Sequence, residues 1–270
     1  MKKLILSIIF ISIILLVVWN HSTITGSVAN NKTETVERDL EITTGEPEPD
    51  KQQLIDIDNT DEKTIYLTFD DGPSSATNDI LDTLKHYHAK ATFFMLEPHM
   101  KQFPDIVKRI VEEGHSVGLH GVTHNKKLFY KSEQSALDEM NKGQEALEKL
   151  TGIKSTLIRT PYGSVPYLLE SYRKELDNEG FKLWDWNVDS SDWSLGSKAY
   201  INVTIKQIEK LHKGNVTPIV LMHDKNETAK HLSTLLEHLT KNGFLFKKIE
   251  EYNKPYSFNC YDRCYRMEDK

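Results

Sequence analysis

The chain of 270 residues has little cysteine and no excess of positive charge. Its only cysteines are Cys260 and Cys264, and two thiolates are too few to form a structural zinc site by themselves. The formal net charge is -6 at pH 7, so the chain offers no basic face for a nucleic acid. These shortages exclude a cysteine-based zinc fold and argue against a nucleic-acid partner.

Two common motifs are also missing. No glycine-rich phosphate loop follows the first predicted strand, which ends at Asp70 and Asp71. His120 and His124 are four residues apart, but no Glu lies between them, so the metalloprotease pattern His-Glu-x-x-His is absent. Any metal chemistry must therefore use a different set of ligands.

The first 21 residues read as a targeting segment. Lys2 and Lys3 precede an almost unbroken apolar run over residues 4–19, which is typical of a signal peptide or a membrane anchor. Ser27-Val28-Ala29 resembles a cleavage site but lies far beyond the run, so a retained anchor is favoured over cleavage. In both cases we expect the rest of the chain on the extracellular face of the membrane or secreted.

Composition divides the remainder into three parts. Residues 22–62 are polar, with Glu46-Pro47-Glu48-Pro49-Asp50 at their centre, and predict a disordered linker. Residues 63–252 carry the regular patterns of a folded domain. Residues 253–270 form a tail in which an extracellular location favours a disulfide between Cys260 and Cys264, the alternative being two free thiols.

Strand and helix patterns alternate about seven times in the predicted domain. Strands are expected at 65–69, 91–96, 115–119, 155–159, 181–188, 217–222 and 244–249, with helices at about 77–88, 105–113, 132–150, 168–179, 200–212 and 227–239. Such alternation predicts an α/β fold with a parallel sheet. Unusual polar residues follow the strands repeatedly, which favours a TIM-like barrel with outer helices over an open doubly wound sheet.

The first strand ends in two adjacent carboxylates, Asp70 and Asp71. These side chains repel each other unless positive groups lie beside them, so we expect a divalent metal at one and a cationic side chain at the other. His120 and His124 have a spacing that suits metal ligation, although alone they could be surface histidines. Together with an Asp they would leave positions open for water and substrate, as a catalytic metal requires.

Three further strand ends carry candidate residues. Arg159 ends a buried-looking strand and needs a carboxylate, for which Asp70 is the natural candidate. The segment 184–193 is dense in Trp and Asp, so Trp193 could be a rim aromatic or an apolar wall for a substrate. His223 follows an apolar strand and is either a packed core residue or a general acid.

Five motifs in this order resemble those of the polysaccharide deacetylases, carbohydrate esterase family four. They are Thr-Phe-Asp-Asp-Gly-Pro, His-x-x-x-His, Arg-x-Pro-Tyr-Gly, Asp-x-x-x-Trp and Leu-x-His, and the resemblance covers roughly residues 64–250. It implies a distorted seven-stranded (β/α) barrel and one divalent metal, often zinc, with Co²⁺ or Mn²⁺ as alternatives. The implied activity is removal of N-acetyl groups from N-acetylglucosamine polymers such as peptidoglycan or chitin.

The resemblance assigns roles residue by residue. Asp70 is similar to the family's general base, and Arg159 to the partner that orients this base. Asp71, His120 and His124 are similar to the three metal ligands. Gly121, by contrast, stands where the family usually has Ser or Thr, so a hydroxyl that would brace the loop between the two histidines is missing.

The remaining matches concern the acyl group and the leaving amine. Tyr162 resembles the residue whose backbone N–H helps to hold the oxyanion, and Leu221 and Trp193 resemble the acetyl-methyl pocket. His223 resembles the general acid. For the carboxylate that supports this acid, the resemblance favours Asp189, with Asp192 as the competing assignment.

The sequence therefore predicts a monomeric, metal-dependent polysaccharide N-deacetylase, held at the cell surface, whose partner is peptidoglycan or a chitin-like polymer. Two alternatives stay open. The first is a non-catalytic wall-binding protein on the same barrel, which only Gly121 favours. The second is a glycosidase that uses Asp70 and another acid such as Asp189, and this would leave the histidine pair unexplained.

Overall fold

The computed structural model describes residues 63–195 and 198–267. The predicted targeting segment (1–21) and linker (22–62) lie outside the described residues. Within the described ranges, no helix combines the length and the apolar character needed to cross a membrane.

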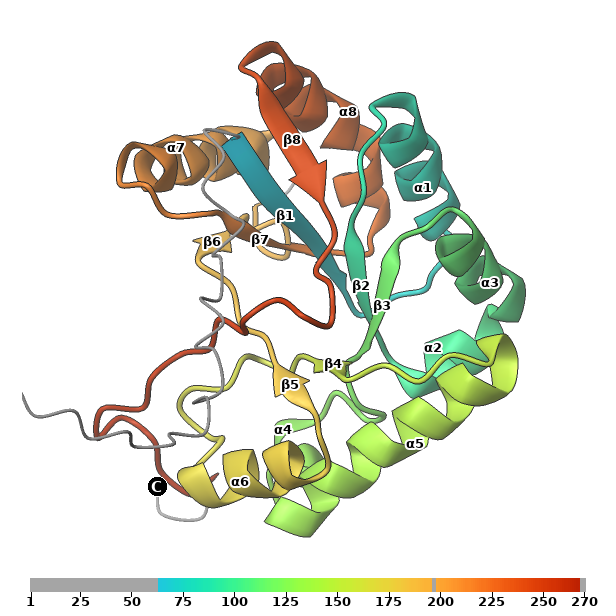
Figure 1. The fold of residues 1–270 in the computed structure, drawn as a ribbon, viewed down its shortest axis with the longest axis vertical. Helices are drawn as coiled ribbons and strands as arrows, with labels where there is room; N and C mark the ends of the chain where they lie inside the picture. The colour runs from blue at the N-terminus through green and yellow to red at the C-terminus, as the bar shows by residue number, and fades with distance from the viewer. Residues whose placement is uncertain (1–62, 196–197, 268–270) are drawn as a thin grey trace, which may run out of the picture. The chain divides into compact units, whose positions relative to one another are not determined.

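All strand pairs of the sheet are parallel. The strands are β1 (Lys63–Asp70), β2 (Thr92–Met95), β3 (Ser116–Leu119), β4 (Leu157–Ile158), β5 (Lys182–Leu183), β6 (Val188–Asp189), β7 (Ile219–His223) and β8 (Phe244–Lys247). Their spatial order is β5-β4-β3-β2-β1-β7-β6, and β8 pairs with the first half of β1. The sheet curls, with helices around its outer side, as the predicted distorted (β/α)7 barrel requires (Figure 1).

The helices are α1 (Thr77–His86), α2 (Glu97–Gln102), α3 (Pro104–Glu112), α4 (Lys126–Phe129), α5 (Glu133–Thr151), α6 (Glu170–Asn178), α7 (Ala199–Lys213) and α8 (Asn226–Lys241). α5 begins at a reciprocal cap between Ser132 and Ser135 and ends at Gly152, whose φ of 74° suits a left-handed cap. The short helices α2 and α4 were not predicted, because one turn of helix leaves no repeating apolar pattern.

β1 lies at the centre of the sheet, because it pairs with β2, β7 and β8. From Leu67 to Asp70 every side chain of β1 is buried, since both faces of a closed parallel sheet are covered. Apolar residues of the helices and strands, among them Ile80, Phe93 and Leu232, form one large core cluster. The carboxylates at the end of β1 therefore follow the buried half of the central strand.

The fifth predicted strand, 181–188, is split into β5 and β6. Asp185 lies in the gap, where its N–H donates to the carbonyl of Tyr256 and its carboxylate accepts from the N–H of Ser164 and of Phe258. These contacts draw the backbone out of the sheet. The two halves of the predicted strand, β5 and β6, therefore lie at opposite ends of the strand order. One chain segment thus closes the barrel by pairing with β4 on one side and β7 on the other.

The C-terminal tail packs against the barrel beside α6 (Figure 1). Its two cysteines, Cys260 and Cys264, form the predicted disulfide. Beyond it, the N–H of Tyr265 donates to the carbonyl of Pro166 at 3.0 Å. The tail therefore contacts the loops that follow β4 and β5, on the side of the barrel where the polar residues gather.

Candidate active site

The two carboxylates at the end of β1 have different surroundings. Asp70 is buried, and its Oδ1 accepts a hydrogen bond from Nη1 of Arg159 at 2.9 Å. Asp71 has a left-handed backbone, with φ at 74°, and its Oδ1 lies 3.4 Å from Nε2 of His120 and 3.3 Å from Nε2 of His124. The turn at Asp71 thus directs neighbouring acids toward separate partners, which removes most of their mutual repulsion.

Arg159 is fully buried and makes four hydrogen bonds with its guanidinium. Besides Asp70, its acceptors are the hydroxyl of Thr68 at 2.6 Å and the carbonyls of Trp184 and Asp185 at 3.1 and 3.0 Å. The guanidinium also lies 4.3 Å from the centre of the Phe94 ring. A guanidinium with so many contacts has a fixed position, and it fixes Asp70 in turn.

Asp71, His120 and His124 form a cluster that suits a divalent ion. One ligand atom from each residue lies within 4.8 Å of the other two. Oδ1 of Asp71 is buried and has no hydrogen-bond partner, which a metal would satisfy. Nδ1 of His120 lies 2.7 Å from the carbonyl of Arg159, so Nδ1 carries the proton and the lone pair of Nε2 faces Asp71. The donor set of one carboxylate and two imidazoles fits zinc.

The charge state of Asp71 also suits ligation. Burial alone would raise the pKa of this carboxyl, but the neighbouring imidazoles of His120, His124 and His223 lower its pKa far below the usual range. Asp71 is therefore anionic at neutral pH, as a metal ligand must be.

Tyr162 lies beside the ligand loop. Its hydroxyl donates to the carbonyl of His124 at 2.9 Å, and its ring packs 4.6 Å from the His124 imidazole. The backbone has φ at 66°, and its N–H donates to no group among the residues that the structure describes. A free N–H at the pocket edge is available to an oxyanion.

His223 lies at the end of β7, and Asp192 rather than Asp189 supports it. Nδ1 of His223 is 2.8 Å from Oδ1 of Asp192, whose Oδ2 accepts from the His223 N–H at 2.7 Å and from the Thr228 hydroxyl at 2.6 Å. Asp189 instead accepts from the N–H of Ser191 at 2.7 Å. The sequence-based preference for Asp189 is wrong on this contact, because the turn at Ser191, with φ at 57°, brings Asp192 back under the histidine.

Most of the predicted residues share one pocket of about 570 Å³, and the other two, Arg159 and Asp192, contact the lining residues Asp70 and His223. Asp70, Asp71, His120, His124, Tyr162, Asp189, Trp193, Leu221 and His223 all line it. Trp193 is 58% exposed whereas Leu221 is buried, so together they give the pocket an apolar wall with an open outer edge.

Two cations at this pocket were missed in the sequence. Lys126 and Lys225 line it, and Nζ of Lys126 lies 4.5 Å from the centre of the Tyr162 ring. Each lysine follows a predicted site histidine by two residues, which is the only sequence signal they give. Glu139 was missed too, although it lies between Ala136 and Gly143 on the apolar side of α5, where a charged residue is unusual.

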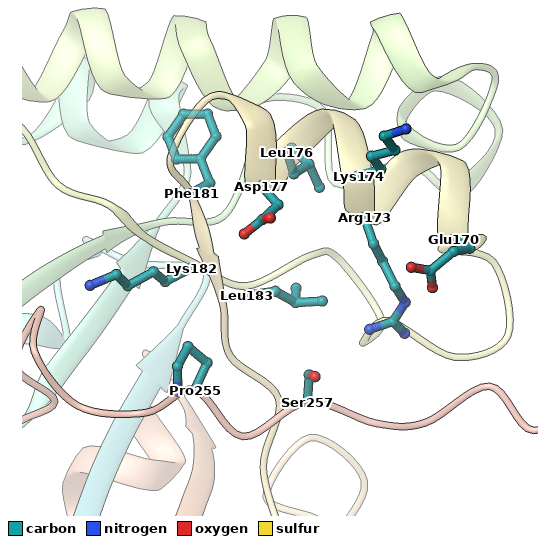
Figure 2. Close-up of a pocket in the computed structure, with 10 residues that line it drawn as sticks. All are labelled: Glu170, Arg173, Lys174, Leu176, Asp177, Phe181, Lys182, Leu183, Pro255 and Ser257. Carbon is teal, nitrogen blue, oxygen red and sulfur yellow. The ribbon is translucent and has the colours of Figure 1, made fainter.

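A second hollow of about 350 Å³ lies between α6, β5 and the tail, where Pro255 and Ser257 face α6 (Figure 2). Two of its three cations are already engaged: Arg173 donates to the Leu168 carbonyl and the Ser164 hydroxyl, and Lys182 donates to the Glu251 carbonyl. No acid–base pair converges here among the described residues, so the barrel-end pocket is the candidate active site.

We expect replacement of Asp192 by Asn to lower the pKa of His223. Burial lowers this pKa, but the hydrogen bond and charge of Asp192, with the charges of Asp70 and Asp71, outweigh burial and raise it. Without the Asp192 charge the imidazolium loses its main support, so it deprotonates at a lower pH. NMR titration of the His223 ring in the wild type and in Asp192→Asn measures the shift.

The matched control is Asp189→Asn, which removes a neighbouring charge that does not contact His223 and keeps an oxygen that can accept from the N–H of Ser191. This variant should titrate like the wild type. A pKa lowered as much by Asp189→Asn as by Asp192→Asn would contradict the assignment of Asp192.

Comparison with known proteins gives a consistent result. The polysaccharide deacetylase family model matches residues 57–182. YheN of Bacillus subtilis, placed among the polysaccharide deacetylases by its name, is 45% identical over 73% of this chain and 71% of its own length. A Bacillus cereus protein named peptidoglycan-N-acetylglucosamine deacetylase is 39% identical over 73% of each chain.

A solved structure agrees. The crystal structure of the polysaccharide deacetylase Bc1974 from Bacillus cereus matches with a TM-score of 0.64 and 39% identity, covering 75% of this chain and 99% of that one. The chain therefore belongs to the polysaccharide deacetylase family and is a hydrolase of N-acetyl amide bonds.

Proposed function

We propose that the chain is a metal-dependent deacetylase that removes N-acetyl groups from N-acetylglucosamine residues of peptidoglycan and releases acetate. One observation carries the proposal: a three-residue metal cluster, an Arg-bound carboxylate and an Asp-bound histidine share one pocket at the end of the barrel. The name of the Bacillus cereus relative supports the choice of substrate.

Asp71, His120 and His124 would hold the ion, which would supply Lewis acidity toward water and the acetamido carbonyl. Asp70 accepts the proton of the attacking water, and the hydrogen bond from Arg159 fixes the orientation of this carboxylate. The free N–H of Tyr162 donates to the oxyanion of the tetrahedral intermediate.

Collapse of the intermediate needs an acid and a place for the acetyl group. His223 donates its proton to the leaving amine, and Asp192 favours the charged imidazole that this step requires. Trp193 and Leu221 form the apolar wall that receives the acetyl methyl group. Asp189 fixes the Ser191 turn and thereby the position of Asp192.

The charges at the pocket favour peptidoglycan over a neutral chitin-like polymer. Lys126 and Lys225 place two ammonium groups at the pocket. The acids that line the pocket, Asp70, Asp71 and Asp189, already have other roles in the site, so the ammonium groups can bind an anionic part of the substrate. The rings of Tyr162 and Tyr167 lie 4.5 and 5.6 Å from Nζ of Lys126 and hold it at the pocket. Peptide stems on a glycan carry carboxylates that these cations can bind, whereas chitin oligomers carry none.

The proposal includes a location. Lys2, Lys3 and the apolar run 4–19 would place the enzyme at the extracellular face of the membrane, or direct it outside the cell, where peptidoglycan lies. The polar stretch 22–62 would act as a linker that lets a monomeric catalytic domain extend from the membrane into the cell wall.

Acetate release should depend on a divalent metal and on Asp70. We expect chelation to abolish release from N-acetylglucosamine oligomers and peptidoglycan, and Zn²⁺ to restore it. Asp70→Asn should lower kcat by about 10²–10⁴-fold, since the base that accepts the water proton is lost.

The control is Asp79→Asn at an exposed position of α1, which should keep wild-type activity. Release of reducing sugar ends that survives chelation would favour the glycosidase instead. Metal binding without release of acetate from either substrate would favour a wall-binding protein.

Lys126→Met should raise KM for a peptide-bearing glycan roughly two- to fivefold, the effect of losing one exposed ion pair. KM for neutral N-acetylglucosamine oligomers should stay within about twofold of the wild type, and added salt should reduce the difference between the two substrates. Steady-state kinetics with both substrates measure this.

Lys127→Met is the matched control, because Lys127 belongs to the same helix but is exposed and does not line the pocket. An equal rise in KM for both substrates in Lys126→Met would contradict carboxylate recognition by this lysine.

A further inference from the structure

The loop between His120 and His124 is held from below by a carboxylate of α5. Oε2 of Glu139 accepts from the N–H of Val122 and from the N–H of Thr123, both at 2.9 Å, and Oε1 accepts from the Thr123 hydroxyl at 2.7 Å. Glu139 is only 7% exposed, so its carboxylate is largely withdrawn from bulk water.

Among residues 63–195 and 198–267, the structure pairs the carboxylate of Glu139 with no Lys, Arg or His. A buried carboxylate that no cation neutralises is costly unless hydrogen bonds satisfy it, and here all three of its bonds come from the loop between the histidines. Its contacts are therefore directed at the loop rather than at the packing of α5.

Gly121 leaves the space that the Glu139 carboxylate occupies beside the loop. Its φ is 85°, and a Cβ at this position would lie 3.0 Å from Oε2 of Glu139 and 3.3 Å from the Phe129 ring. The carbonyl of Gly121 accepts from the N–H of Glu97. The absence of a side chain at Gly121 thus lets the carboxylate approach the loop closely. Glu139 of α5 therefore supplies the support that a Ser or Thr hydroxyl at position 121 would otherwise give the loop.

Apart from the hydrogen bond between Glu97 and Gly121, the rest of the loop is held at its two ends. Nδ1 of His120 is held by the carbonyl of Arg159, and the carbonyl of His124 is held by the hydroxyl of Tyr162. Between these ends, Glu139 is the group that binds the amides of Val122 and Thr123. The distance between the two imidazoles therefore depends on it.

We propose that Glu139 is a positioning residue for the metal site: its carboxylate sets the geometry of the His120–His124 loop and thereby the affinity for the ion. This inference rests on the proposed metal-dependent function. It assigns the bracing function to Glu139 and Gly121 as a pair, and it removes the one sequence feature that favoured a degraded site.

The test is Zn²⁺ affinity, measured by competition with a chelating indicator, together with the absorption spectrum of the Co²⁺-loaded protein. We expect Glu139→Gln to weaken Zn²⁺ binding by about 10- to 100-fold, the usual effect of losing an outer partner of metal ligands. The amide keeps the size of the side chain but presents an NH₂ group to the loop amides, so the ligand geometry and the Co²⁺ spectrum should change.

Two further variants make the result specific. Thr123→Val lies on the exposed loop and removes one of the three bonds without changing α5, so it should weaken Zn²⁺ binding less than Glu139→Gln does. Glu145→Gln, an exposed position of the same helix, should leave both affinity and spectrum unchanged.

The outcomes separate this inference from the proposed function. A wild-type protein that binds Zn²⁺, with Glu139→Gln equal to Glu145→Gln in affinity and Co²⁺ spectrum, would overturn the inference alone. Lowered thermal stability of metal-free Glu139→Gln with unchanged affinity would do the same and assign Glu139 to packing. A wild-type protein that binds no divalent ion would overturn both.

Discussion

The buried ion pair between Arg159 and Asp70 is the interaction on which the site depends. β4 and β1 are not neighbours in the sheet, so the guanidinium reaches across the barrel interior to bind the carboxylate. Its hydrogen bonds to Thr68 and to two carbonyls offset the cost of burying a charge. Removing one partner of such a pair typically costs about 3–5 kcal/mol, because the other charge is left buried and alone.

The same ion pair gives the adjacent residues Asp70 and Asp71 different partners. Arg159 binds Asp70 with its side chain and, through its carbonyl, holds the proton on Nδ1 of His120. Asp71 is left free to face His120 and His124. Arg159 therefore orients both the proposed base, Asp70, and one proposed metal ligand, His120. This explains how the adjacent residues Asp70 and Asp71 can serve in proton transfer and in metal binding, respectively.

Much of this arrangement could be predicted from the sequence, because strand ends and motif residues coincide. Asp70 and His223 end an apolar strand and His120 and Arg159 follow one, and parallel strands bring such positions to one end of a barrel. Asp192 could not be distinguished from Asp189, because the choice depends on the turn at Ser191. The charge of Glu139 on the apolar side of α5 is visible in the sequence, but its hydrogen-bond partners on the His120–His124 loop are not.

The most direct test of the account is a crystal structure of the zinc-loaded protein with anomalous diffraction at the zinc edge. The account predicts one strong peak about 2.0–2.2 Å from a carboxylate oxygen of Asp71 and from Nε2 of both His120 and His124. It also predicts that Asp70 remains bound to Arg159 and does not contact the ion. A peak coordinated by Asp70 in place of Asp71, or no peak among these residues, would contradict the assignment of Asp70 as the base and Asp71 as the metal ligand.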